Sequence, residues 1–150
     1  MSVRLYGPDL RDYRPRRSSR HVLLADDDRD MRMMLAAALR EDGFEVTEIG
    51  DGSELFQTVH AWLRYGDRRE IDAIVTDIRM PAFSGLEVLA EIRALDTSLP
   101  VILITAFGDR QTHAEARALG ADAVFDKPFD VDDLRTALLN IIPPDHPRAA

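Results

Sequence analysis

Short apolar runs alternate with longer amphipathic segments from His21 to Ile142, and this alternation restricts the fold more than any other feature of the sequence. Each apolar run has the length of a buried strand, and each segment after it repeats its apolar residues at the spacing of a helix. Five such pairs follow one another along the chain. Strands that alternate with helices in this way form parallel sheets, because a parallel pair needs a crossover between its strands. The sequence therefore predicts an α/β fold.

The expected strands occupy residues 22–25, 45–49, 73–76, 101–105 and 123–125, and the expected helices occupy about 30–42, 53–65, 86–95, about 110–119 and 131–142. The first, third and fourth strands are almost wholly apolar, so we expect them in the middle of the sheet. Right-handed crossovers leave few ways to arrange five such units, and the doubly wound open sheet is the common one. In that architecture a ligand binds beyond the carboxyl ends of the central strands.

Residues with strong preferences for helix ends support these boundaries. Gly43 supplies a left-handed stop after the first helix, and Gly66 ends the second. Asp130 is a good N-cap for the fifth helix, and Asp28 or Asp30 can cap the first.

One folded domain is expected to span residues 21–142. A chain of 150 residues, with 45% hydrophobic and 31% charged residues, has the size and composition of a single globular domain. Residues 1–20 hold six arginines against two aspartates and should form a basic, flexible arm. Residues 143–150 begin with two prolines and should form a polar tail. Residues 66–72 are mostly polar and predict a loop before the third strand.

The composition argues against several classes of function. The net charge is −8 although the arm is basic, so the domain itself is acidic and is not expected to bind nucleic acid. The absence of cysteine rules out disulfides and thiolate metal sites, and it suits a reducing cytosol. No segment has the apolar length of a signal peptide core or a membrane span. We therefore expect a cytoplasmic protein without a membrane partner.

Charged and polar side chains follow the expected strands at the edge where a ligand should bind. Asp26 and Asp27 come after the first strand, Asp77 after the third, Thr105 ends the fourth, and Lys127 follows the fifth. Clustered carboxylates repel one another, so a hard divalent cation with oxygen ligands explains them best. Magnesium fits, because it takes one or two carboxylates directly and bridges to phosphoryl oxygens. Lysine and threonine would contact the remaining phosphoryl oxygens.

Simpler roles compete with these assignments. A threonine that ends a buried strand is often structural, so Thr105 alone does not identify the site. Lys127 differs, because it is the single lysine in a chain with eighteen arginines. A compact point charge, rather than a planar guanidinium, suits this position.

Four segments, in this order and spacing, resemble the receiver domains of bacterial two-component response regulators. They are VLLADDD at 22–28, DAIVTDIRMPAFSGLEVL at 72–89, PVILITA at 100–106 and GADAVFDKPFD at 120–130. The resemblance covers residues 21–142 and implies a flavodoxin-like fold, a five-stranded parallel sheet with strand order 2-1-3-4-5.

The resemblance also implies roles for individual residues. Asp77 would be the phosphoacceptor that attacks a phosphohistidine of a sensor kinase or phosphotransfer protein. Asp27 would bind magnesium directly, Asp26 mainly through water, and the backbone carbonyl of Arg79 would complete the protein ligands. The protein would then be a phosphoacceptor regulator, not an enzyme.

Further positions follow from the same resemblance. Thr105 would donate a hydrogen bond to a phosphoryl oxygen, Lys127 would neutralise another, and the small Ala106 would leave room for the group. A cis peptide before Pro128 would direct the lysine into the site.

Two positions are expected to modulate the response. Val124 stands where the family usually has an aromatic residue that turns inward, and Phe125 lies on the opposite face of the strand. We therefore expect the switch to run through residues 105–119 without an aromatic flip. The side chain of Arg79 would tune the lifetime of the aspartyl phosphate.

Other functions fit the sequence less well. A phosphatase of the haloacid dehalogenase kind needs a second aspartate two residues after the nucleophile, where this chain has Arg79. A flavodoxin-like cofactor binder needs a glycine- or hydroxyl-rich loop after the first strand, where this chain has three carboxylates. A receiver-like scaffold that is never phosphorylated would not need the full set of acids, threonine and lysine. A transcription factor would need a DNA-binding segment after Ile142.

We expect an unidentified downstream protein as a second partner, and a homodimer formed on phosphorylation is a further possibility.

Overall fold

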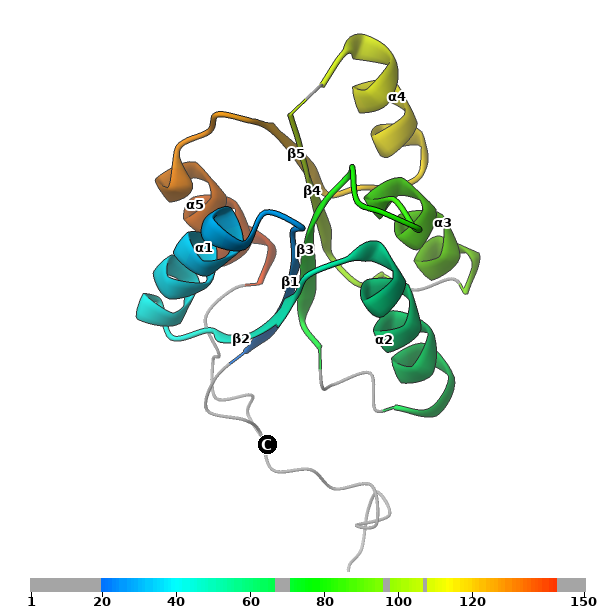
Figure 1. Cartoon of the computed structure of the whole chain (residues 1–150), viewed down its shortest axis with the longest axis horizontal. Helices are drawn as coiled ribbons and strands as arrows, with labels where there is room; N and C mark the ends of the chain where they lie inside the picture. The colour runs from blue at the N-terminus through cyan, green and yellow to red at the C-terminus, as the bar shows by residue number, and fades with distance from the viewer. Residues whose placement is uncertain (1–19, 67–70, 96–97, 107, 143–150) are drawn as a thin grey trace, which may run out of the picture.

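The computed structural model describes residues 20–66, 71–95, 98–106 and 108–142. In these residues strands and helices alternate strictly (Figure 1). The strands are β1 (His21–Ala25), β2 (Glu45–Ile49), β3 (Ala73–Asp77), β4 (Val101–Thr105) and β5 (Ala123–Asp126). The helices are α1 (Arg29–Glu41), α2 (Gly52–Tyr65), α3 (Gly85–Ala94), α4 (Arg110–Ala118) and α5 (Val131–Ile141). Residues 1–19 of the expected arm, the expected tail and residues 67–70 of the expected loop lie outside the described residues.

The five strands form one parallel sheet in the order β2-β1-β3-β4-β5, which confirms the predicted doubly wound topology. The apolar strands β1, β3 and β4 occupy the middle of the sheet, as expected. Among the described helices, none combines the length and apolar character that a membrane span requires.

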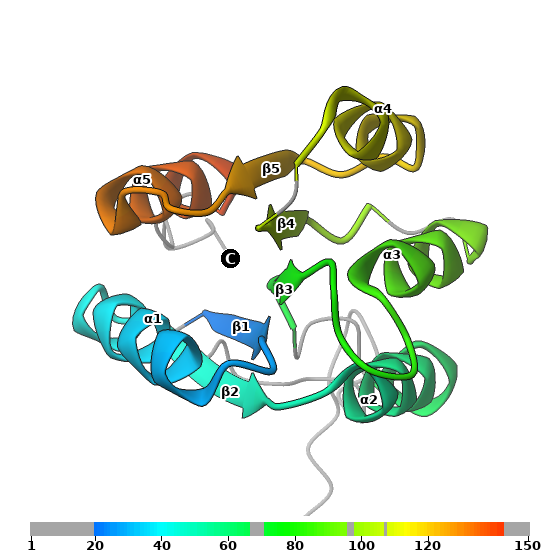
Figure 2. The same ribbon diagram turned by 45° about the horizontal axis from the view of Figure 1, so that its top comes forward.

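Each face of the sheet has its own hydrophobic core. Helices α1 and α5 cover one face, and α2, α3 and α4 cover the other (Figure 2). Along β1, Val22 and Leu24 pack with the α1 and α5 side, whereas Leu23 and Ala25 pack with the other side, because successive strand residues point to opposite faces. Every residue of β3 and β4 is buried. Because β3 and β4 are packed on both faces of the sheet, their ends are held in place, and these ends carry the polar side chains of the site.

Side-chain caps decide where the helices begin. Asp51 caps α2 and Ser84 caps α3 in a capping box, so both helices start one residue earlier than expected. Asp28, rather than Asp30, caps α1, and Asp130 caps α5 as predicted.

The end of α1 confirms the predicted glycine stop. Gly43 has a φ of +90°, and its N–H donates to the carbonyl of Arg40 at 3.0 Å. The Phe44 N–H donates to the carbonyl of Leu39 at 3.1 Å, which completes a Schellman motif. Phe44 and Leu39 are both buried in the same core. The glycine therefore turns the chain directly from α1 into β2.

We predict that Gly43→Ala lowers the free energy of unfolding by about 1–2 kcal/mol, the usual strain of a left-handed residue with a Cβ atom. No atom lies within 4 Å of the added methyl group, so backbone strain alone is responsible. Gly43→Asn should cost less, because asparagine tolerates this region. Urea denaturation measures both effects. An unchanged unfolding midpoint for Gly43→Ala would contradict the left-handed conformation.

Candidate functional site

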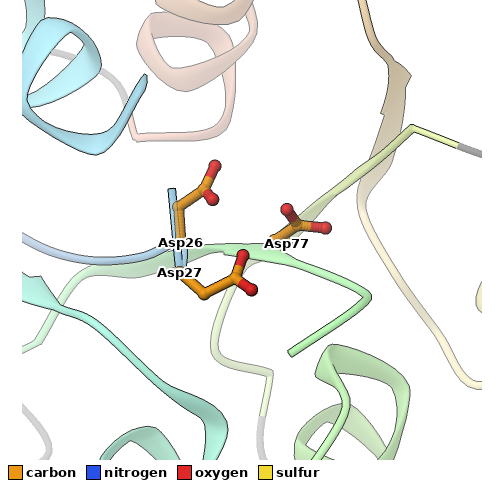
Figure 3. Close-up of side chains that lie close together, drawn as sticks. All are labelled: Asp26, Asp27 and Asp77. Carbon is orange, nitrogen blue, oxygen red and sulfur yellow. The ribbon is translucent and has the colours of Figure 1, made fainter. Parts of the chain in front are cut away.

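Three carboxylates meet at the carboxyl edge of the sheet, where β1 and β3 end. The residues Ala25 and Thr76 are paired across these two strands, so Asp26 and Asp77, which follow them, lie side by side. Figure 3 shows Asp26 and Asp27 next to one another at the end of β1, with Asp77 beside them. One carboxylate oxygen from each of the three residues lies within 4.8 Å of the others. Asp26 and Asp77 are buried, whereas Asp27 is exposed.

Lys127 joins the two buried carboxylates. Its Nζ atom lies 2.9 Å from Oδ2 of Asp77 and 3.3 Å from Oδ2 of Asp26. The lysine follows β5, its backbone N–H donates to the carbonyl of Thr105 at 2.8 Å, and its peptide bond to Pro128 is cis. The ammonium group therefore comes from a strand that is not adjacent to β1 or β3, and it reaches both acids across the end of β4.

The second oxygen of each buried carboxylate accepts a backbone N–H. Asp28 donates to Oδ1 of Asp26 at 2.9 Å, and Arg79 donates to Oδ1 of Asp77 at 3.1 Å. Each buried acid thus holds one oxygen on its own loop and turns the other toward Lys127. This arrangement fixes the direction of both carboxylates.

Burial and charge change the acidity of the site. Burial is the main cause that raises the pKa of Asp26 above its usual value. The hydrogen bond from the N–H of Asp28 lowers this pKa, the charge of Asp77 raises it further, and the charge and hydrogen bond of Lys127 lower it. Partial burial acts to lower the pKa of Lys127, but the hydrogen bond and charge of Asp77, together with Asp26, bring the pKa above its usual value. Lys127 is therefore charged at neutral pH. One ammonium facing three carboxylates leaves excess negative charge, which favours a further cation.

The other predicted residues surround this cluster. Thr105 is buried at the end of β4, and the small Ala106 after it is exposed. The Arg79 side chain is exposed. Val124 is half-buried and packs with the core on the α2, α3 and α4 side. Phe125 packs on the opposite face of the sheet, with its ring 5.7 Å from that of Phe129.

An open hollow of about 460 Å³ adjoins Asp27, the exposed member of the acidic cluster. It lies between the loop after β1 and the loop after β3, so the edge of the site is accessible from solvent. Its lining is Asp27, Ile78, Arg79, Met80, Pro81, Ser84 and Leu86.

Two contacts near the site involve residues that no sequence pattern indicates. Arg32 donates from Nη1 to the backbone carbonyl of Asp26 at 2.8 Å. His113 of α4 lies with Nε2 2.9 Å from Oδ1 of Asp126, at the end of β5. Both contacts join elements that are far apart in sequence or separated by a loop, so neither leaves a periodic signal.

Comparisons with known proteins agree with this site. The family model of the response regulator receiver domain matches residues 22–139. Sporulation initiation phosphotransferase F of Bacillus subtilis is 27% identical over 122 residues, which are 81% of this chain and 93% of the relative. Transcriptional regulatory protein PdtaR of Mycobacterium tuberculosis is 36% identical over 120 residues, which are 79% of this chain and 55% of the relative. The chain thus spans about half the length of PdtaR, and its match covers 23% of regulatory protein AtoC of Escherichia coli.

Solved structures give the same result. The receiver domain of the Francisella response regulator 1452 superimposes with a TM-score of 0.72 at 27% identity, over 82% of this chain and 96% of that one. The chemotaxis protein CheY4 of Vibrio cholerae gives a TM-score of 0.69 at 26% identity, over 82% of this chain and 98% of that one. The fold, the acidic cluster and the family match confirm the resemblance expected from the sequence: the chain belongs to the response regulator receiver domains, the phosphoacceptor modules of two-component phosphorelays.

Proposed function

We propose that Asp77 accepts a phosphoryl group from the phosphohistidine of a sensor kinase or a phosphotransfer protein, and that magnesium assists the transfer. The observation that carries the proposal is the position of Lys127, whose ammonium group lies 2.9 Å from Asp77 and 3.3 Å from Asp26 in an acidic cluster. A charged group at this point can neutralise an incoming phosphoryl oxygen. The relative from Bacillus subtilis is named a phosphotransferase, which supports this class of donor and acceptor.

The donor set suits magnesium. Three carboxylates within 4.8 Å offer hard oxygen ligands, and the described cluster includes no nitrogen or sulfur ligand. Asp27 is exposed and would bind the ion directly, Asp26 would bind it mainly through water, and Asp77 and the carbonyl of Arg79 would complete the set. Bound magnesium supplies positive charge that neutralises the phosphoryl oxygens during transfer.

The chain itself provides the nucleophile and positions it. A carboxylate oxygen of Asp77 forms the bond to phosphorus while the bond from phosphorus to the donor imidazole nitrogen breaks. The N–H of Arg79 holds the other oxygen of Asp77, so the carboxylate cannot rotate freely. The Lys127 ammonium and the Thr105 hydroxyl then bind phosphoryl oxygens, and the exposed, small Ala106 leaves space for the group.

The alternatives fit the site less well. A phosphatase of the haloacid dehalogenase kind needs an acid in place of Arg79, which is an exposed base. A scaffold that is never phosphorylated has no need for a lysine between two buried carboxylates.

The same proposal places the protein in the cytoplasm, with an unidentified downstream protein as its target and a homodimer as one form that phosphorylation can favour.

The conformational response is proposed to begin at Thr105 and to pass through residues 106–109 into α4. This helix buries only Ala116 among its described residues, so it is held less firmly than the central strands. Gly108 lies against the His113 and Asp126 pair so closely that a Cβ atom there would overlap the Asp126 carboxylate. A displacement of this loop therefore reaches α4 and β5 together, and it needs no aromatic rotamer change.

We predict that acetyl phosphate with magnesium adds one phosphoryl group to the parent protein and none to Asp77→Asn, because asparagine has no carboxylate nucleophile. Intact-protein mass spectrometry measures the addition. Asp28→Asn is the matched control, since Asp28 caps α1 and asparagine caps equally well. A phosphoryl group on Asp77→Asn, or none on the parent and the control, contradicts the assignment.

We further predict that magnesium stabilises the folded protein, by about 2.7 kcal/mol at 100 times its dissociation constant. Asp26→Asn should be more stable than the parent in chelator, because the buried carboxylate has a raised pKa and its charged form opposes folding. This advantage is fully present above the raised pKa and is lost as the pH falls below the usual value of 3.8, where Asp26 is protonated in both the folded and the unfolded state. The variant should gain less stability from magnesium.

Asp27→Asn provides the comparison in the same melting curves. Its side chain is exposed, so its stability in chelator should remain close to that of the parent, while its gain from magnesium should fall. Equal magnesium gains in the parent and both variants would show that the ion is bound elsewhere.

A further inference from the structure

Arg32 connects the loop after β1 to the end of β2. Its Nη1 atom donates to the backbone carbonyl of Asp26 at 2.8 Å, and its Nε atom lies 3.5 Å from Oε1 of Glu48. The arginine side chain is only 17% exposed. A mostly buried guanidinium that contacts two elements has little freedom to move, so it restrains both of them.

The backbone of Asp26 is held on both sides. Its N–H donates to the carbonyl of Ile49 at 3.1 Å, and its carbonyl accepts from Arg32. The space around the guanidinium is confined as well, since a Cβ atom at Gly50 would lie 3.3 Å from Nη1 of Arg32. The peptide between Asp26 and Asp27 therefore has a fixed orientation.

That orientation matters most for Asp27. The carboxylate of Asp26 is also fixed by the N–H of Asp28 and by Lys127. The Asp27 side chain is exposed, so the orientation of its backbone is the main factor that places its carboxylate close to that of Asp77.

We propose that Arg32 is a positioning residue for the cation site, because it holds the Asp26 carbonyl and so keeps the Asp26 and Asp27 carboxylates directed toward Asp77. The inference rests on the proposed magnesium-dependent phosphoryl transfer. Arg32 reaches this site through the backbone of Asp26, and its guanidinium takes no part in binding the ion.

An effect through charge and an effect through positioning would change magnesium affinity in opposite directions when Arg32 is removed. A guanidinium near a cation site repels the cation, so removal of its charge alone would strengthen magnesium binding. Loss of the restraint on the Asp26 carbonyl would weaken magnesium binding, because the ligands would no longer be held in place. Removal of such an outer contact typically weakens metal binding by about ten-fold or more.

Arg40 offers a matched control on the same helix. It lies with Nη1 3.3 Å from Oε2 of Glu48 and donates from Nη2 to the carbonyl of Val46 at 3.0 Å. It thus shares Glu48 with Arg32, but its carbonyl partner lies on β2 and not at the acidic cluster. Arg40→Met removes a similar charge and a similar backbone contact.

The experiment is an amide NMR titration of the full chain with magnesium chloride at neutral pH, in which spectral dispersion also reports folding. We expect the dissociation constant of Arg32→Met to rise about ten-fold, and that of Arg40→Met to stay at the parent value. Arg32→Lys keeps the charge and one donor for the Asp26 carbonyl, so its value should lie between those of the parent and Arg32→Met.

Other results overturn the inference. An unchanged or lower dissociation constant for Arg32→Met would show that Arg32 acts only through its charge or through stability. Equal weakening in Arg40→Met would show a general effect of α1. If Arg32→Met does not fold, Arg32→Lys decides, and binding as tight as in the parent then overturns the inference. If the parent itself binds no magnesium, the proposed function fails and the inference fails with it.

Discussion

The ammonium group of Lys127 lies between the carboxylates of Asp77 and Asp26, and the rest of the site depends on this contact. Two buried acids at the ends of neighbouring strands repel one another, and one positive charge held between them reduces that repulsion. The sheet makes the contact possible, because β1, β3 and β5 all end at the same edge. The backbone of Lys127 is fixed to Thr105, so the lysine and the threonine move as neighbours. Asp77 is therefore linked through Lys127 to the ends of β4 and β5.

Apolar packing stabilises the sheet, whereas the charged groups are confined to the edge where its strands end. The apolar side chains of β1, β3 and β4 are buried on both faces, and they hold the strand ends firmly. The polar groups that follow those ends lie at the edge of the core, where Asp26 is buried with a raised pKa. Such a site lowers stability, and the proposed function explains why it is retained, since the same charged groups would bind a cation and a phosphoryl group. Helix α4 buries a single described residue, Ala116, so it is held less firmly than the central strands.

Much of this arrangement could be predicted from the sequence. The alternation of apolar and amphipathic segments predicted a doubly wound parallel sheet, since few windings of five such units are possible, and the resemblance to receiver domains implied its strand order. The carboxylates and the lysine were predicted at one edge because parallel strands end there together. The starts of α2 and α3 were each predicted one residue too late, because the side chains of Asp51 and Ser84 cap these helices at the preceding position. Arg32 and the His113 and Asp126 pair could not be predicted, because their contacts depend on the tertiary packing of loops and not on periodicity.

The most direct test of the account is a crystal structure of the protein with magnesium and beryllofluoride, a mimic of the phosphoryl group. We expect beryllium bonded to a carboxylate oxygen of Asp77, magnesium beside Asp26 and Asp27, and the Lys127 ammonium moved from Asp26 to a fluorine atom. We also expect the Thr105 hydroxyl to turn toward the same group. Beryllofluoride bound at another residue, or a Lys127 ammonium that still joins Asp26 and Asp77 when the group is present, would contradict the account.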